Sequence, residues 1–186
     1  MKRTLVASIL GIAASVAMVA SSYGQGQVWF DNYNNVNTIN GIGGYSSPIT
    51  LLTTGSGATL APSSITASLY YYLGTTTDAS QVNSLAATAP VKASNPGYLT
   101  ASIATIPDYV SGAITFQVTA SGLIGGVEYT GASPLLTLSS ISTGTTLPGY
   151  LDNLQAFAVN PVPEPTTLAL AGLGAAALLA MRRRTS

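Results

Sequence analysis

Five carboxylates are the side chains best able to do chemistry in the central part of this 186-residue chain: Asp31, Asp78, Asp108, Glu128 and Asp152. Two acids at a suitable separation are enough for glycoside hydrolysis, in which one donates a proton and the other acts as base or nucleophile. The five are scattered along the sequence, and each is more simply explained as a solvated loop or turn residue. We therefore expect no catalytic residues and a protein that is not an enzyme, with a glycosidase pair as the remaining alternative.

Histidine and cysteine are both absent from the chain. Without them the protein cannot form a serine–histidine triad, a cysteine nucleophile, a thiolate or imidazole zinc site, or an attached haem. A Ser-x-x-Lys dyad is also excluded, because Ala89 stands three residues before Lys92. We expect no cofactor, and the fold must be held by its core without disulfides.

An asparagine-rich stretch contains the residues that come nearest to a calcium site: Asp31, Asn32, Asn34, Asn35 and Asn37. Calcium sites usually recruit several carboxylates, and this cluster has one. Asn and Asp also favour turns, because their side chains bond to nearby backbone groups. A turn is therefore the preferred interpretation, and no metal site is predicted.

Tyr70 and Tyr72 offer a binding chemistry. They lie in a stretch in which Leu69, Tyr71 and Leu73 alternate with them, as in a half-buried strand. If the alternating set faces inward, the two tyrosines are neighbours on the outer face, where their rings could stack on sugar rings. Alternatively, the pair is structural, since tyrosines are good strand formers that pack against neighbouring strands. A carbohydrate-binding module for exopolysaccharide is thus the alternative function.

Strand patterns dominate the rest of the central part and predict an all-β fold. Short apolar stretches, several of them alternating with polar residues and separated by glycine-rich turns, predict a single antiparallel β-sandwich-like domain of about seven strands over residues 25–160. Residues 78–87 could form a short helix capped by Asp78, or a loop. The predicted strands cover residues 27–33, 48–54, 65–73, 98–106, 114–121, 135–139 and 154–159.

Charge is sparse in this domain. Residues 25–160 contain one basic residue, Lys92, and the five carboxylates, which gives this part a net charge of −4. Nucleic-acid binding requires a basic surface, so no nucleic-acid partner is expected.

The amino terminus has the pattern of a secretory signal peptide. Lys2 and Arg3 precede an apolar stretch over residues 5–20, and small residues follow. We predict a signal peptide over residues 1–24, handled by the Sec translocon and signal peptidase, with cleavage before Gln25 and cleavage before Tyr23 as a second choice. An uncleaved anchor helix is the alternative.

The carboxyl terminus combines three features in a fixed order. Pro163, Glu164 and Pro165 are followed by an apolar run over residues 168–181 and then by Arg182, Arg183 and Arg184. The run predicts a transmembrane helix over residues 167–181, with the arginines on the cytoplasmic side because Lys and Arg prefer that side. A plain membrane anchor or a buried core helix would not explain the Pro-Glu-Pro element.

This tail, residues 161–186, resembles the PEP-CTERM sorting signal of exported proteins in Gram-negative bacteria that make extracellular polysaccharide. The resemblance implies that the Pro-Glu-Pro element is the recognition element and that the arginine trio is the basic stop. It also implies that an exosortase-type membrane transpeptidase handles the chain. The protein would then pass through an intermediate tethered to the inner membrane and end in the cell envelope, on the cell surface or in the extracellular matrix.

The central part also resembles small cargo proteins of Verrucomicrobia-like bacteria at residues 25–33, 67–71 and 114–118. That resemblance implies the domain boundaries and the β fold, and it implies no activity.

Overall fold

The computed structural model describes residues 25–34, 45–52, 54–55, 57–162 and residue 173. The predicted signal peptide and, apart from Leu173, the predicted transmembrane helix lie outside these residues. Within the part of the chain that is described, no helix is long and apolar enough to cross a membrane.

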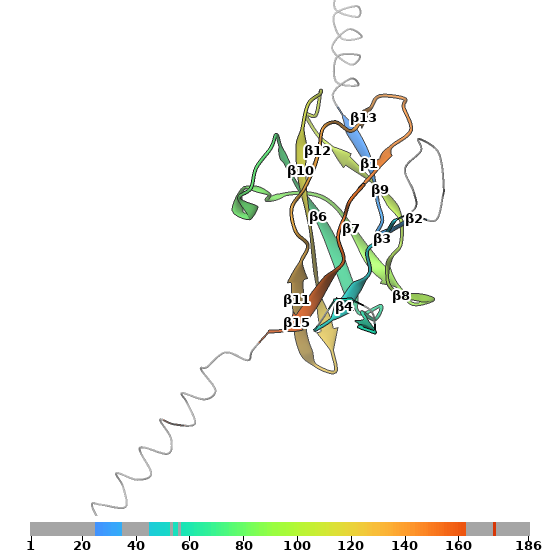
Figure 1. Cartoon of the computed structure of the whole chain (residues 1–186), viewed down its shortest axis with the longest axis vertical. Helices are drawn as coiled ribbons and strands as arrows, with labels where there is room; N and C mark the ends of the chain where they lie inside the picture. The colour runs from blue at the N-terminus through green and yellow to red at the C-terminus, as the bar shows by residue number, and fades with distance from the viewer. Residues whose placement is uncertain (1–24, 35–44, 53, 56, 163–172, 174–186) are drawn as a thin grey trace, which may run out of the picture.

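The larger of two main sheets contains the longest strands and has the order β5-β4-β15-β11-β10-β6-β7-β8, with β12 paired to β10. Figure 1 shows β6, β7 and β10 running along the long axis of the body. The strands of this sheet are β4 (Ile49–Leu51), β5 (Thr59–Leu60), β6 (Ile65–Leu73), β7 (Ser84–Lys92), β8 (Asn95–Leu99), β10 (Ile114–Ile124), β11 (Val127–Ala132), β12 (Leu136–Leu138) and β15 (Phe157–Pro161).

The smaller sheet is built on β1, which pairs with β9, β13 and β14. A separate two-stranded ribbon joins β2 to β3. Most neighbouring strands are antiparallel, whereas β1 with β14 and β15 with β4 are parallel. The bounds are β1 (Gly26–Phe30), β2 (Tyr33–Asn34), β3 (Tyr45–Ser46), β9 (Ser102–Ile106), β13 (Ser142–Thr143) and β14 (Gly149–Tyr150).

One hydrophobic core lies between the two sheets. Leu69 of β6 stands opposite Val118 of β10, and both side chains are buried, because residues of a strand alternate between the two faces of a sheet. Phe30 of β1 and Ile106 of β9 belong to the same buried cluster. Burying each large apolar side chain contributes about 1.5–3 kcal/mol, so this cluster supplies the stability that disulfides supply in many exported proteins.

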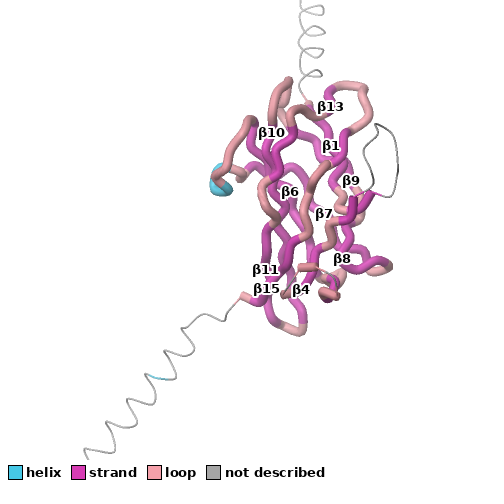
Figure 2. The backbone as a smooth tube through the Cα atoms, viewed as in Figure 1, coloured by secondary structure: helices cyan, strands magenta, loops and turns pink. Residues whose placement is uncertain are grey.

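The all-β prediction is confirmed, and each of the seven predicted ranges overlaps at least one strand, although the range 98–106 covers parts of two, β8 and β9, which lie in different sheets. Figure 2 shows how little of the body is helical. Two long strands, β7 and β11, were not predicted. The short helix considered for residues 78–87 is reduced to one turn, η1 (Ala79–Gln81), capped by Asp78 as expected. Ser84 and Leu85 belong to β7 instead, because they pair with Tyr71 and Tyr70 of β6.

The body has two opposite ends. β10 runs from one to the other, and its eleven residues span about 33 Å at the usual rise of a strand. At the end where β10 begins, called the far end here, Ile114 stands opposite Leu73, and β1 begins at Gly26 beside Ile106. At the other end, called the tail end, Pro161 of β15 stands opposite Tyr129 of β11. The two termini of the described body therefore lie at opposite ends (Figure 1).

Candidate functional site

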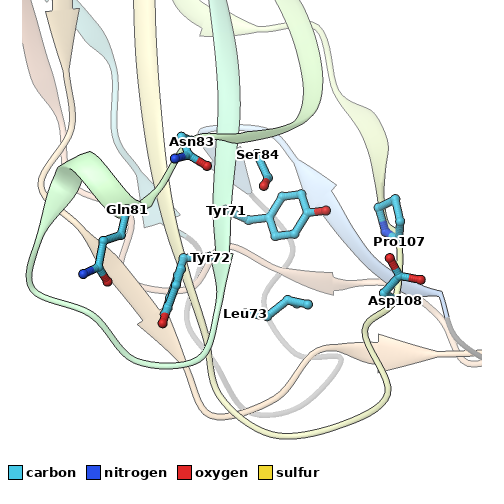
Figure 3. Close-up of a pocket in the computed structure, with 8 residues that line it drawn as sticks. All are labelled: Tyr71, Tyr72, Leu73, Gln81, Asn83, Ser84, Pro107 and Asp108. Carbon is cyan, nitrogen blue, oxygen red and sulfur yellow. The ribbon is translucent and has the colours of Figure 1, made fainter.

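An open cleft of about 540 Å³ lies at the far end of the body. Its volume is within the range of small-molecule and sugar-sized sites. Figure 3 shows the side chain of Tyr71 directed toward Pro107 and Asp108, while Tyr72 leaves β6 on the side of Gln81. The lining residues are Tyr71, Tyr72, Leu73, Gln81, Asn83, Ser84, Pro107 and Asp108.

Thr115 of β10 fixes the loop that follows β6 and forms one wall of the cleft. Its hydroxyl is fully buried and donates to the carbonyl oxygen of Gly74 at 2.9 Å. The hydroxyl oxygen of Thr115 also accepts from the backbone N–H of Thr76 at 3.2 Å and lies 2.9 Å from the Thr137 hydroxyl. Thr76 in turn places its hydroxyl 2.9 Å from Oε1 of Gln81, so one buried threonine positions a cleft side chain through the loop.

The helical turn η1 adds a second support for Gln81, its last residue. Asp78 caps this turn by accepting hydrogen bonds from the backbone N–H of Ser80 at 2.9 Å and from the Ser80 hydroxyl at 2.7 Å. These two bonds hold the pKa of the Asp78 carboxyl below its ordinary value, because they favour the charged form. The cap therefore stays charged at neutral pH.

Tyr71 and Asp108 define the electrostatics of the cleft. Partial burial raises the pKa of the Tyr71 phenol, and the negative charge of Asp108 raises it further. The phenol is thus neutral at physiological pH and can both donate and accept a hydrogen bond. Asp108 has a φ of 61°, the left-handed conformation that aspartate tolerates better than most residues. Rings, an amide and a carboxylate together provide groups that can stack on and hydrogen-bond to a polyhydroxylated ligand.

The two tyrosines predicted from the sequence differ in their surroundings. Tyr70 stands opposite Gln117 of β10 and Leu85 of β7, and it is half-buried. Tyr72 is 36% exposed, and of the two it is the one that lines the cleft. The pair lies on one face of β6, but the cleft reaches round the end of the strand to Tyr71 on the other face.

Sequence reasoning missed Tyr71 and Asp108 as cleft residues. Alternation assigned Tyr71 to the core, yet the core ends near this point, since Leu73 on the same face is 44% exposed. Asp108 reaches the cleft because β9, which ends at Ile106, lies in the opposite sheet. No local pattern in the sequence links residues from two different sheets.

The asparagine-rich stretch contains a structural amide. The side chain of Asn32 is buried and donates to the carbonyl oxygens of Ser47 at 3.0 Å and Gly97 at 2.8 Å. Its Oδ1 accepts from the backbone N–H of Leu99 at 2.8 Å. The amide thus connects three separate chain segments, while Asn35 and Asn37 lie outside the described residues. Among the described residues, no group of three or more acidic side chains could hold a metal ion.

The tail end carries the link to the carboxyl-terminal element. The backbone N–H of Val162 donates to the carbonyl oxygen of Glu128 at 2.8 Å, which continues the pairing of β15 with β11. Pro163 follows at the next position. The predicted sorting residues, Pro163, Glu164, Pro165, Arg182, Arg183 and Arg184, lie outside the described residues.

The fold and its end thus define an all-β body whose last strand leads directly into a tail. The profile of the family described as PEP-CTERM protein-sorting motif matches residues 161–184. The chain therefore carries the signal of an exported protein that is anchored in the membrane before an exosortase processes it.

Comparison with curated proteins and with solved structures gives no match. The resemblance of the body to Verrucomicrobia cargo proteins therefore gains no support from a homologue. The sorting motif covers the tail and leaves the activity of the body open.

Proposed function

We propose that this protein is a non-enzymatic component of the cell surface or extracellular matrix, delivered by its sorting motif and separated from its tail by an exosortase-type transpeptidase. The observation that carries the proposal is the junction at the tail end. A folded β body with a single core extends to Val162, and the sorting motif matches residues 161–184. The folded body and the sorting motif are thus contiguous, and removal of the tail would release the whole body.

The composition of the chain supports a role without catalysis. Neither histidine nor cysteine is present, so the common hydrolytic sites cannot be built. The signal-peptide pattern before Gln25 supports the same route, because it would bring the body to the outer side of the inner membrane. We propose the cell envelope or the extracellular matrix as the final location.

The test is the intact mass of the protein recovered from the surface of its host, combined with mapping of its carboxyl-terminal peptide. We expect a form that begins near Gln25 and ends near Pro165. Replacing Pro163, Glu164 and Pro165 by alanine should leave the tail attached, whereas Val162→Ala should be processed as the natural chain is. A surface form that retains Arg182 to Arg184 would contradict the transpeptidase step.

Carbohydrate binding is the second candidate, and the far-end cleft favours it. The cleft places two tyrosine rings beside an amide and a carboxylate in a volume of about 540 Å³. Aromatic rings stack on the apolar faces of sugars, and amides and carboxylates bond to their hydroxyl groups. The cleft also lies at the end opposite the tail, where a polymer outside the cell could reach it.

Retention on exopolysaccharide extracted from the host tests this second function. We expect Tyr72→Ala and Asp108→Asn to weaken retention, because both residues line the cleft. Tyr70→Ala is the matched control, since Tyr70 lies on the same strand outside the cleft lining. Unchanged retention in the two cleft variants, with folding intact by circular dichroism, would rule out this site.

A further inference from the structure

Four exposed apolar side chains gather at the tail end of the body. They are Leu52, Leu123, Val127 and Val162, and we call them the apolar rim. Leu123 is 62% exposed and Leu52 is 58% exposed; apolar side chains are exposed at the far end as well, where Val110 is 72% exposed.

Backbone pairing brings the four residues to one end. Leu123 stands opposite Glu128 in the β10–β11 hairpin, whose turn lies between Ile124 and Val127. Val162 bonds to the carbonyl oxygen of the same Glu128, and the N–H of Leu52 bonds to the carbonyl oxygen of Val159 at 3.0 Å. Figure 1 shows β11, β15 and β4 meeting at the end where the described body leads into the tail.

The length of the connecting chain limits how far this end can be from the membrane. Leu168, where the apolar run of the tail begins, is six positions after Val162. A fully extended chain of that length reaches about 20 Å. While the tail is anchored, Val162 therefore cannot be more than about that distance from the start of the anchoring segment.

The distribution of charge also favours the tail end as the end that faces the membrane. Lys92, the single basic residue of the body, ends β7 at the tail end, beyond the pairing of Pro90 with Thr66. Asp78 and Asp108 lie at the far end, around the cleft. Glu128 lies beside the rim, and two further carboxylates, Asp31 and Asp152, are not part of either cluster. An anionic bilayer would repel the far end more strongly than the tail end.

We propose that the apolar rim rests on the lipid bilayer during the membrane-anchored stage that the sorting motif defines. The hairpin tip and Val162 then enter the headgroup region, as exposed apolar side chains do at membrane interfaces. The long axis of the body then points away from the membrane plane, and the far-end cleft faces away from the membrane. Release of the tail frees the rim together with the body.

The absence of cysteine makes a direct test feasible, since one introduced thiol is then the only site for a label. We would purify the tail-bearing chain from membranes, reconstitute it in phosphatidylethanolamine–phosphatidylglycerol vesicles, and attach a fluorophore at Leu123→Cys. Val110→Cys is the matched control, because Val110 is 72% exposed in the segment that joins β9 to β10 at the far end. Brominated lipids then report which label lies at the bilayer.

We expect brominated lipids to remove most of the fluorescence of the label at position 123 and to leave the label at position 110 unaffected. Adding Val127→Asp should abolish the quenching at position 123, whereas Val110→Asp should not change it. Equal quenching at both positions, or quenching that survives Val127→Asp, would overturn the proposal. Protection of the label at position 123 from solvent that appears only when exosortase is present, or only at high protein density, would also overturn the proposal, in favour of a protein partner.

Discussion

The backbone N–H of Val162 bonds to the carbonyl oxygen of Glu128 at 2.8 Å, one residue before the Pro-Glu-Pro element begins. The pairing of β15 with β11 therefore extends to the edge of the sorting motif. An exosortase that reads this motif must work beside a folded hairpin, because no linker separates the two. The stability of this last strand thus bears on both folding and delivery.

Thr115→Val should destabilise the body and loosen the wall of the cleft. Valine keeps the shape of threonine but leaves the N–H of Thr76 and the carbonyl oxygen of Gly74 without their buried partner. We expect a loss of about 1–3 kcal/mol in the free energy of unfolding, measured by urea titration. Thr137→Val is the control, since Thr137 is exposed and bonds within this network to Thr115. A loss no larger in Thr115→Val than in Thr137→Val would contradict the assigned role of Thr115.

Asn32→Asp should destabilise the body strongly. The substitution places a carboxylate oxygen against the carbonyl oxygens of Ser47 and Gly97, where the amide now donates two hydrogen bonds. We expect a cost of about 2–4 kcal/mol at neutral pH, because the charge is buried and only one of its two oxygens keeps a donor, the N–H of Leu99.

The pH dependence of this variant has a defined sign. The folded state would raise the pKa of the new carboxyl above its unfolded value of about 4, so the variant should be least affected below that pH and lose stability as the pH rises. Asn95→Asp, at the exposed first residue of β8, should change little and provides the comparison. Equal unfolding free energies for the two variants at neutral pH would show that the Asn32 network contributes nothing.

The parts of the fold that the sequence predicted are those in which one strand carries its own pattern. In β6 and β10, apolar and polar residues alternate, and the structure buries Leu69 and Val118 as expected. β7 was missed because its middle, around Ala86, contains a register shift against β6 that breaks the alternation. β11 was missed because none of its residues is buried, so its position follows from pairing with β10 and β15.

The cleft could be predicted only in part for a related reason. Tyr72 was identified from its own strand, whereas Tyr71 and Asp108 become neighbours only when the end of β9 meets the end of β6. Thr115 had no special feature in the sequence, because its role depends on the loop that folds over it. Long-range packing creates these relationships, and a local pattern cannot encode them.

Tyr71 should make the stability of the body sensitive to alkaline pH. Its pKa is raised from 10.0 by partial burial and by Asp108, so the folded state favours the neutral phenol. The resulting stability is fully present below about pH 10 and is lost as the pH rises through the folded pKa. We expect the unfolding free energy of the natural protein to fall more steeply above that pH than that of Tyr71→Phe.

Asp108→Asn separates the two causes of this shift. It removes the neighbouring charge and leaves the burial, so the alkaline loss should become smaller without disappearing. The ionisation of Tyr71 can be followed as the difference in phenolate absorbance between the natural protein and Tyr71→Phe. Superimposable pH profiles for the natural protein and Tyr71→Phe would show that Tyr71 does not titrate differently in the folded state.

Gly131→Ala should weaken the attachment of the last strand. A Cβ atom at Gly131 would overlap the carbonyl oxygen of Ala158 and lie 3.0 Å from the Cα atom of Val159, both of which belong to the backbone of β15. Backbone atoms cannot rotate away, so β15 must shift, and we expect the free energy of unfolding to fall by about 1–3 kcal/mol. Thr130→Ala, at the preceding exposed position, should stay within about 0.5 kcal/mol of the natural protein in the same urea titration.

Because Val162 follows directly from β15, Gly131→Ala should also speed hydrogen exchange at the Val162 amide relative to Thr130→Ala. Unchanged exchange there would mean that the end of the body is held independently of β15.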